Sequence, residues 1–323
     1  MLSVSIGICY NRDVTAAIPI IDFQRYDADR PATLRDLANE VDEALSTIGF
    51  LAIRNLGIKD ALIDEVFGAS QAFFHADAGT KRRSAYVSAA ENFGYQGIAQ
   101  ENLDPSAPAD LKETFTMRDV LNKPPDDDRW PSPAFRSLMS RFYARCLEAA
   151  FRLQRVLAVA LNTEADFFTR CHSGENVTLR LLHYPTTGVD AVQSGQLGAG
   201  AHTDYGLLTL LFQSGVGGLE VQAADGTWQA VDPDPDAVVI NSGDLLEIWT
   251  NGRYRSTPHR VQPKIGGAER QSIAMFVDPD SDTEVTALWS CITADNPPRF
   301  SPTTAGKHLQ ERIEASHKAR FAS

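Results

Sequence analysis

The stretch GAHTDYGLLTLL (200–211) places a histidine, His202, two residues before a carboxylate, Asp204, and then runs into strand-forming residues. Side chains at positions i and i+2 of a β-strand point to the same face. On a strand, His202 and Asp204 therefore present an imidazole and a carboxylate to one ion. The pair predicts two ligands of a metal site beside a buried strand.

A third metal ligand is expected downstream, and the strongest candidate is His259 in STPHRV (256–261). Two histidines and one carboxylate on one face of an ion form the facial triad of non-haem Fe(II) oxygenases, which leaves positions open for a co-substrate and O₂. A hydrogen-bonded histidine–aspartate pair without a metal is the alternative for His202 and Asp204 when they are considered alone.

A candidate anion-binding pair, Arg270 and Ser272, opens the apolar segment RQSIAMFV (270–277). The two residues share one face of the predicted strand. A guanidinium fork beside a hydroxyl suits a carboxylate ligand. A surface ion pair is the alternative for Arg270 alone, but its position at the end of a barrel strand favours an inward anion site.

The second half of the chain is typical of a β-sandwich or barrel. After about residue 176, short runs rich in Val, Leu, Ile and Thr alternate with Gly, Asp and Pro turns. The expected strands are VTLRLLHY (177–184), LLTLLFQ (207–213), GLEVQ (218–222), WQAV (228–231), AVVIN (237–241) and QSIAMFV (271–277).

The first half is mainly helical by its apolar periodicity. Residues 88–131 are polar and rich in Gly and Pro, and are expected to form a long functional or disordered loop. Helices are expected at 33–48, 59–75, 134–161 and 305–320, with a short strand at 49–55. We expect a mainly β protein with flanking helices, a β-barrel core buttressed by N-terminal helices. It forms one domain over 1–323: a helical part at about 1–175, the barrel at about 176–300 and the C-terminal helix.

Composition narrows the partners and the compartment. The net charge of -12 and the absence of a dense Lys/Arg cluster disfavour nucleic acid and anionic membrane surfaces. No apolar window reaches transmembrane length, and MLSVSIGICYNRDV (1–14) has no basic n-region typical of a secretory signal. The four cysteines are scattered, as expected for free thiols. The sequence therefore favours a cytoplasmic protein with a small-molecule partner, and it makes no prediction of the oligomeric state.

Several segments resemble the isopenicillin N synthase-like family of Fe(II)- and 2-oxoglutarate-dependent dioxygenases. The resemblance covers roughly residues 18–305 and implies a double-stranded β-helix (jelly-roll) core that holds Fe(II). The block at 94–119 is similar to the segment before the barrel in bacterial members, including the ethylene-forming enzyme. The other matching segments are IPIIDF (18–23), GFLAIRNLGI (49–58), HTDYGLLTLL (202–211), NSGDLLEIWTNGRYRSTPHRV (241–261) and RQSIAMFV.

The resemblance assigns roles to individual residues. His202, Asp204 and His259 match the iron ligands, and no catalytic residue is expected beyond them. Arg270 and Ser272 match the pair that holds the distal carboxylate of 2-oxoglutarate. The remaining co-substrate positions are Tyr184, which matches a tyrosine that helps bind that carboxylate, and Arg180 and Tyr205, which resemble positions near the co-substrate in ethylene-forming relatives.

Other residues have weaker assignments. This chain has Leu182 where plant members usually have Asn. His183 precedes Tyr184 and points to the opposite face, so a structural role is expected for it; a solvated or capping role is expected for His75. The candidate substrate contacts are Glu101, which falls near an acidic contact in the ethylene-forming enzyme, and Asn102, Arg118 and Phe276.

The predicted function is that of a non-haem Fe(II)- and 2-oxoglutarate-dependent dioxygenase. With O₂, it oxidises an unactivated carbon of a small molecule, by hydroxylation in the default case, and releases succinate and CO₂. One alternative is an Fe(II) oxidase or cyclase of the isopenicillin N synthase type, which does not use 2-oxoglutarate. The other is a binding protein that has lost catalysis. A zinc hydrolase is disfavoured because no dedicated general base lies near the triad in the sequence.

Overall fold

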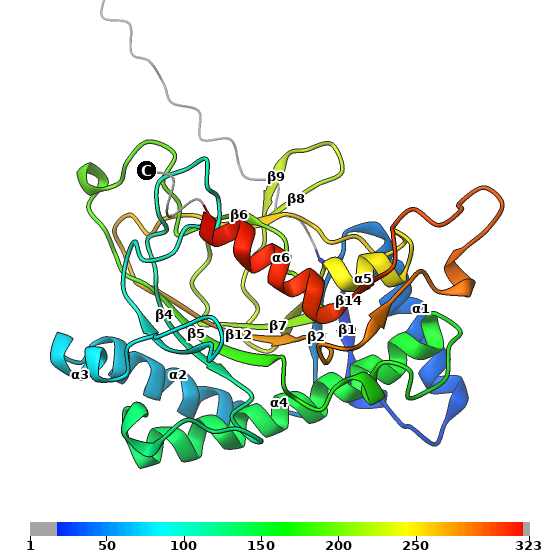
Figure 1. The fold of residues 1–323 in the computed structure, drawn as a ribbon, viewed down its shortest axis with the longest axis horizontal. Helices are drawn as coiled ribbons and strands as arrows, with labels where there is room; N and C mark the ends of the chain where they lie inside the picture. Colours follow the sequence, from blue (N-terminus) through cyan, green and yellow to red (C-terminus); the bar gives the residue numbers. More distant parts are fainter. Residues whose placement is uncertain (1–17, 319–323) are drawn as a thin grey trace, which may run out of the picture.

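Two β-sheets face each other at the centre of the computed structural model, which describes residues 18–318 (Figure 1). The larger sheet has eight strands in the order β1-β2-β10-β7-β12-β5-β4-β3. In that order the strands are β1 (Ile20–Asp22), β2 (Phe50–Arg54), β10 (Val238–Ser242), β7 (Leu208–Gln213), β12 (Arg270–Val277), β5 (Val177–Tyr184), β4 (Glu113–Arg118) and β3 (Phe93–Gln96).

The smaller sheet has four strands in the order β6-β11-β8-β9. These strands are β6 (Ala199–His202), β11 (His259–Val261), β8 (Leu219–Gln222) and β9 (Trp228–Ala230). A separate pair joins β13 (Glu284–Val285) to β14 (Thr303–Thr304). The two facing sheets form the predicted jelly-roll, and the predicted fold class is confirmed.

The alternation of side chains divides the interior into two cores. On β5, Leu182 and Tyr184 pack in a cluster with Val221 and Val261 of the smaller sheet. Their neighbour on the same strand, Leu181, belongs to the other cluster, which includes the buried faces of the helices. Period-2 alternation thus sends one set of side chains between the sheets and the other set toward the helices.

Helices cover the outer face of the larger sheet (Figure 1). The longest, α4, is capped at its N-terminus by Ser132, whose side chain accepts a hydrogen bond from the backbone N–H of Phe135, and Pro133 occupies the first helical position. Its residues Phe142 and Leu153 are fully buried against the sheet side. The helices on this face are α1 (Pro31–Thr47), α2 (Asp60–Phe74) and α4 (Pro133–Ala160). The other helices are α3 (Ala78–Arg83), α5 (Asp244–Trp249) and α6 (Ala305–Lys318), of which α5 and α6 lie on the opposite side (Figure 1).

The segment 88–131 is a correction to the sequence analysis, because it contains β3 and β4 instead of one long loop. β4 pairs with β5 and so extends the larger sheet. Its apolar residues Phe115 and Met117 join the helix-side core, while Thr114 and Thr116 alternate with them. The expected helices at 33–48, 59–75 and 134–161 are confirmed within two residues of their bounds.

Within residues 18–318, no helix combines the length and apolar character needed to cross a membrane. Cys146, Cys171 and Cys291 are free thiols, as expected. Cys9 and the N-terminal segment 1–14 lie outside the described residues, so the expectations for them stay predictions.

Candidate metal centre

Three predicted metal ligands meet between the two sheets. His202 ends β6, and His259 starts the adjacent strand β11, where the two residues are directly paired. Nε2 of His202 lies 4.0 Å, and Nε2 of His259 lies 3.7 Å, from Oδ1 of Asp204. Asp204 lies just beyond the end of β6, so the shared-strand geometry expected for it was wrong, although its carboxylate still reaches the two imidazoles.

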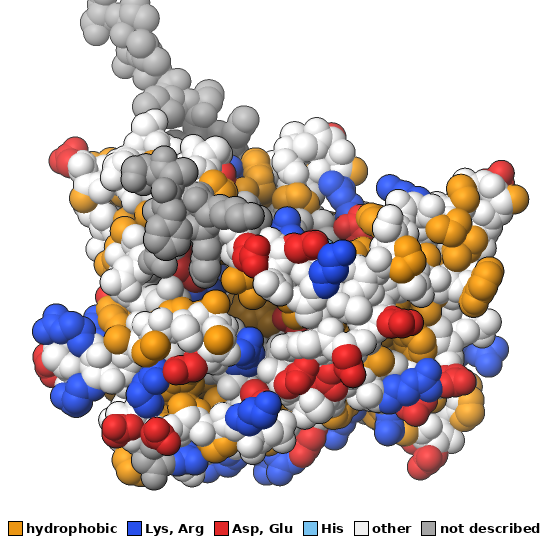
Figure 2. Space-filling model, viewed as in Figure 1, with side chains coloured by type: hydrophobic (Ala, Val, Ile, Leu, Met, Phe, Trp, Pro, Cys, Tyr) orange, Lys and Arg blue, Asp and Glu red, His pale blue; other side chains and the backbone are white. Residues whose placement is uncertain are grey.

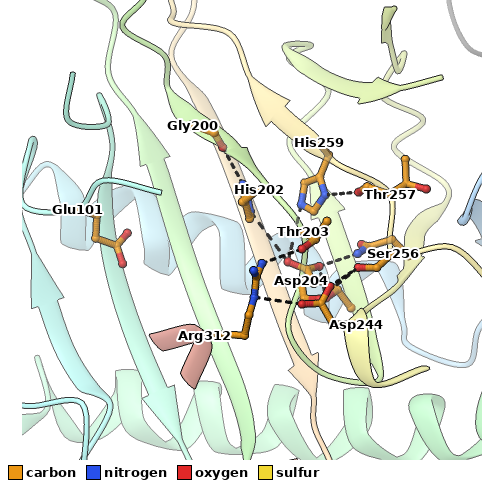
Figure 3. A network of polar contacts seen from close by, with 12 residues as sticks. Glu101, Gly200, His202, Thr203, Asp204, Asp244, Ser256, Thr257, His259 and Arg312 are labelled. Atoms are coloured by element: carbon orange, nitrogen blue, oxygen red, sulfur yellow. Dashed lines mark hydrogen bonds and ion pairs between the residues drawn. The ribbon is translucent and has the colours of Figure 1, made fainter. Parts of the chain in front are cut away.

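Backbone carbonyls orient both imidazoles (Figure 3). Nδ1 of His202 lies 2.7 Å from the carbonyl oxygen of Gly200, and Nδ1 of His259 lies 3.2 Å from that of Thr257. A carbonyl oxygen can only accept, so each Nδ1 carries the proton and donates it. Both Nε2 atoms are thereby left with a free lone pair for an ion.

Asp204 is held by its other oxygen. Oδ2 accepts hydrogen bonds from Oγ1 of Thr209 at 2.5 Å and from Nδ2 of Asn241 at 2.6 Å. Oδ1 is therefore the oxygen that faces the imidazoles. Thr209 and Asn241 carry no pattern in the sequence that points to this role, because they come from β7 and β10 and reach Asp204 only through the folding of the sheet.

The protonation state of the site suits a metal. Burial and the neighbouring imidazole of His259 lower the pKa of His202 to about 3. His202 is therefore neutral at neutral pH, as a metal-bound histidine must be. Two imidazole nitrogens and one carboxylate oxygen, all within 4.8 Å of one another, fit the facial triad that binds Fe(II).

Arg270 also lies between the two sheets, and its hydrogen-bond partners, Ser272 and Gln213, carry no negative charge. It is 1% exposed, and Nη1 and Nη2 donate to Oγ of Ser272 at 3.1 Å and to Oε1 of Gln213 at 3.0 Å. Cζ lies 4.7 Å from the ring centroid of Tyr184, and Nε has no hydrogen-bond partner among the described residues. Burial lowers the pKa of Arg270, because a buried cation without a counter-ion is costly. The arrangement fits an anionic ligand.

A cavity of about 780 Å³ connects the triad with Arg270. Figure 2 shows this face of the molecule hollowed beside α6, with apolar side chains deep in the hollow. Asn102 is not among the lining residues, and its side chain donates to the carbonyl of Ala107. The other predicted residues that line the cavity are Ser272, Tyr184, Arg180, Tyr205, Glu101, Arg118 and Phe276.

Comparisons with known proteins match this geometry. Residues 161–279 match the 2OG-Fe(II) oxygenase superfamily, and residues 18–135 match the N-terminal region of non-haem dioxygenases in morphine synthesis. A 2-oxoglutarate-Fe(II) type oxidoreductase of Metarhizium majus is 31% identical over 91% of this chain and 93% of its own length. The chain belongs to the 2OG-Fe(II) oxygenase superfamily.

Solved structures of the superfamily share the fold. A full-length Neurospora crassa protein in complex with alpha-ketoglutarate is 29% identical, with a TM-score of 0.84 over 92% of this chain and 96% of the neighbour. JOX2 in complex with 2-oxoglutarate, Fe and JA is 28% identical, with a TM-score of 0.77 over 93% and 88% of the two chains. The protein is an Fe(II)- and 2-oxoglutarate-dependent dioxygenase that requires O₂, and the family supports this prediction over the alternative without 2-oxoglutarate.

One wall of the oxygenase cavity holds a chain of buried and partly buried charges. Glu101 forms one ion pair with Arg180 and a second with Lys112, whose Nζ lies 3.3 Å from Oε2 of Glu101. Lys112 also forms an ion pair with Asp110. Burial alone raises the pKa of Glu101, but these two cations outweigh it and lower the pKa to about 2. Arg180 was expected near the co-substrate and Glu101 near the substrate, whereas in the structure the two residues form an ion pair with each other.

The C-terminal helix closes another side of the cavity. From α6, Leu309 and Ile313 line the cavity. Nε of Arg312, on the same helix, lies 3.1 Å from Oδ2 of Asp244, and Nη2 donates to Oγ1 of Thr203 at 2.9 Å (Figure 3). The guanidinium of Arg312 also packs over the ring of Tyr205. Tyr205 is thus in contact with α6, a partner that the sequence pattern did not indicate.

Proposed function

We propose that His202, Asp204 and His259 hold the Fe(II) of this dioxygenase, and that Arg270 with Ser272 binds the distal carboxylate of 2-oxoglutarate. One observation carries the second assignment: a 1% exposed guanidinium whose contacts supply no negative charge. A carboxylate at this position satisfies both the charge and the orphaned Nε.

When bound, the iron centre with 2-oxoglutarate and O₂ supplies the oxidation that adds oxygen to the substrate and releases succinate and CO₂. This chain's residues position those components. Thr209 and Asn241 aim Oδ1 of Asp204 toward the site. The ring of Tyr184 packs on the guanidinium of Arg270 and fixes its plane. Arg270 therefore loses little side-chain conformational entropy when it binds a carboxylate.

The proposed substrate is a small molecule with polar and apolar parts, and the proposed reaction is its hydroxylation. The cavity volume of about 780 Å³ lies within the range typical of small-molecule sites, about 300–1,000 Å³. One solved neighbour contains thymine, and relatives are named proline hydroxylase and homoarginine-6-hydroxylase. Arg180 and Glu101 provide polar contacts on one wall and Phe276 provides an apolar surface, so both ends of an amphipathic molecule are accommodated.

We also propose that residues 1–323 form one oxygenase domain, because the inter-sheet core and the helix-side core share the larger sheet. A cytoplasmic location is proposed from the free thiols, which persist in reducing compartments.

The assignments are tested without a substrate. Fe(II) and then 2-oxoglutarate are added anaerobically to the metal-free protein, and the weak visible charge-transfer band of a chelated 2-oxoacid is recorded. The band is expected in the unaltered protein and is expected to disappear in His259→Ala. A band of full intensity in that variant would overturn the metal assignment. Hydroxylation is tested by succinate release with a panel of amino acids, nucleobases and small carboxylic acids, followed by mass spectrometry for one added oxygen atom.

A further inference from the structure

A second group of metal-type ligands lies on the other face of the larger sheet. It consists of His75, directly after α2, His183 on β5, and Glu269, directly before β12. Oε2 of Glu269 lies 2.9 Å from Nε2 of His75 and 3.1 Å from Nε2 of His183. These three atoms all lie within 4.8 Å of one another.

The spacing of these atoms is close to what a tetrahedral ion needs. A tetrahedral ion with bonds of about 2.0–2.2 Å to nitrogen and oxygen holds its ligand atoms roughly 3.3–3.6 Å apart. The two nitrogen–oxygen distances are slightly shorter than this, so a small outward movement of the side chains admits an ion. His75 has the freedom to make that movement, because its side chain is 52% exposed.

The surroundings fix two of the ligands and leave one side open. His183 is 4% exposed, and its ring stacks on Phe74 at a centroid separation of 5.3 Å. Burial raises the pKa of Glu269, but hydrogen bonds from His75 and His183 outweigh it and lower the pKa to about 2. Glu269 is therefore a carboxylate at neutral pH, and the exposed side at His75 gives an ion and a water molecule access.

We propose that His75, His183 and Glu269 form a second metal site, which binds a divalent transition-metal ion with the ligand preference of Zn(II). Two imidazole nitrogens and one carboxylate oxygen, with a water as fourth ligand, are a donor set that Zn(II) accepts. The roles expected from the sequence, structural for His183 and solvated or capping for His75, give way to metal ligation in this proposal.

The proposed second metal site lies on the opposite face of the larger sheet from Arg270, the residue proposed to bind the distal carboxylate of 2-oxoglutarate. Glu269 is the neighbour of Arg270, and His183 is the neighbour of Tyr184, which is paired with Arg270 across the two strands. An ion bound to these ligands ties the end of α2 to the β5–β12 pair at that point. We expect the ion to stabilise this corner of the sheet and not to take part in oxidation.

The test separates the second site from the iron site. The background is the full-length double variant His202→Ala/His259→Ala, which lacks two iron ligands. Co(II) is titrated into it, with stoichiometry from calorimetry and the visible absorption of four-coordinate Co(II) as readouts. One equivalent of bound Co(II), with that absorption and a rise in melting temperature, is expected. An absence of bound Co(II) in this background would overturn the proposal.

Two further variants assign the bound ion to its ligands. Adding Glu269→Gln, which keeps the shape and hydrogen-bonding capacity of the side chain, is expected to lower Co(II) affinity at least tenfold. The matched control adds His308→Ala instead, which removes another histidine that faces an aspartate, Asp244, at 3.4 Å; binding is expected to be unchanged. Equal Co(II) affinity with and without Glu269→Gln, in a protein of unchanged circular dichroism, would also overturn the proposal.

Discussion

Asn241 donates a hydrogen bond of 2.6 Å to Oδ2 of Asp204, although the two residues are 37 positions apart in the chain. Together with the bond from Thr209, this contact occupies the carboxylate oxygen that faces away from the two histidines. The strand β10 thus helps to determine which oxygen of Asp204 faces the proposed iron site. Partners of this kind around metal ligands influence affinity strongly.

Replacing Asn241 with Ala is expected to lower Fe(II) affinity by about 10–100-fold, because the carboxylate loses an orienting donor. An anaerobic Fe(II) titration of the purified variant measures this. Asn122→Ala is the matched control, since Asn122 also donates to an aspartate, Asp119, at 2.8 Å but does not line the cavity. Equal affinities in the two variants would show that Asn241 has no orienting role.

Arg270→Ala is expected to raise the KM for 2-oxoglutarate while Fe(II) binding stays largely intact. Removal of one partner of a buried charged pair costs about 2–5 kcal/mol, which corresponds to at least about a 25-fold increase. Arg270→Lys is expected to restore only part of the loss, because an ammonium lacks the planar fork. Steady-state succinate formation at varied 2-oxoglutarate measures both. Full recovery with Lys would mean that charge alone is recognised.

Glu101→Gln is expected to destabilise the protein by about 3–5 kcal/mol at pH 7, because Arg180 and Lys112 lose their shared counter-charge. Urea unfolding followed by circular dichroism measures the difference. Glu65→Gln, which alters an exposed ion pair with Arg141, is the control and is expected to change stability by less than about 1 kcal/mol.

The contribution of Glu101 depends on pH with a defined sign. Its pKa in the folded protein, about 2, is below the ordinary value of 4.5. Its stabilisation is therefore complete above about pH 4.5 and is lost as the pH falls toward 2. The stability difference between the unaltered protein and Glu101→Gln should shrink over this acidic interval. A difference that stays constant from pH 6 to pH 3 would contradict the low pKa.

Metal and co-substrate are expected to stabilise the folded state by mass action. A ligand present at about 100 times its dissociation constant adds about 2.7 kcal/mol to the free energy of unfolding. Mn(II), used in place of the oxidisable Fe(II), should raise the melting temperature of the unaltered protein, and 2-oxoglutarate should raise it further. In Arg270→Ala the second increment should disappear while the first remains. Thermal denaturation with and without each ligand gives both increments.

The parts of the site that sequence predicted share short-range patterns. His202 and Asp204 are two residues apart, and Arg270 and Ser272 lie on one strand face, so short spacing indicated both pairs, although Asp204 lies outside the strand that was assumed for it. Asn241, Thr209 and Gln213 carry no such pattern, because their proximity to the site arises from strand pairing in the sheet.

The strands β3 and β4 were overlooked because their surroundings are polar and rich in turn residues. The alternation in KETFTMR (112–118) was nevertheless a usable signal, since Phe115 and Met117 alternate with polar side chains. The inner face of β4 is polar because it borders the cavity, which is lined by Thr116 on this strand and by Lys112 directly before it. A strand with one face toward a binding site contains fewer apolar residues than a strand with both faces buried in the core.

The helix α6 builds a wall of the cavity from residues that come after all the proposed iron and co-substrate ligands in the chain. Of the proposed iron and co-substrate ligands, His202, His259, Arg270 and Ser272 lie on paired strands, where a change of register would move several of them at once. Leu309 and Ile313 belong to a single terminal helix and carry no such constraint. Substrate preference can therefore diverge by substitutions in this last helix, while the oxidation chemistry is inherited unchanged.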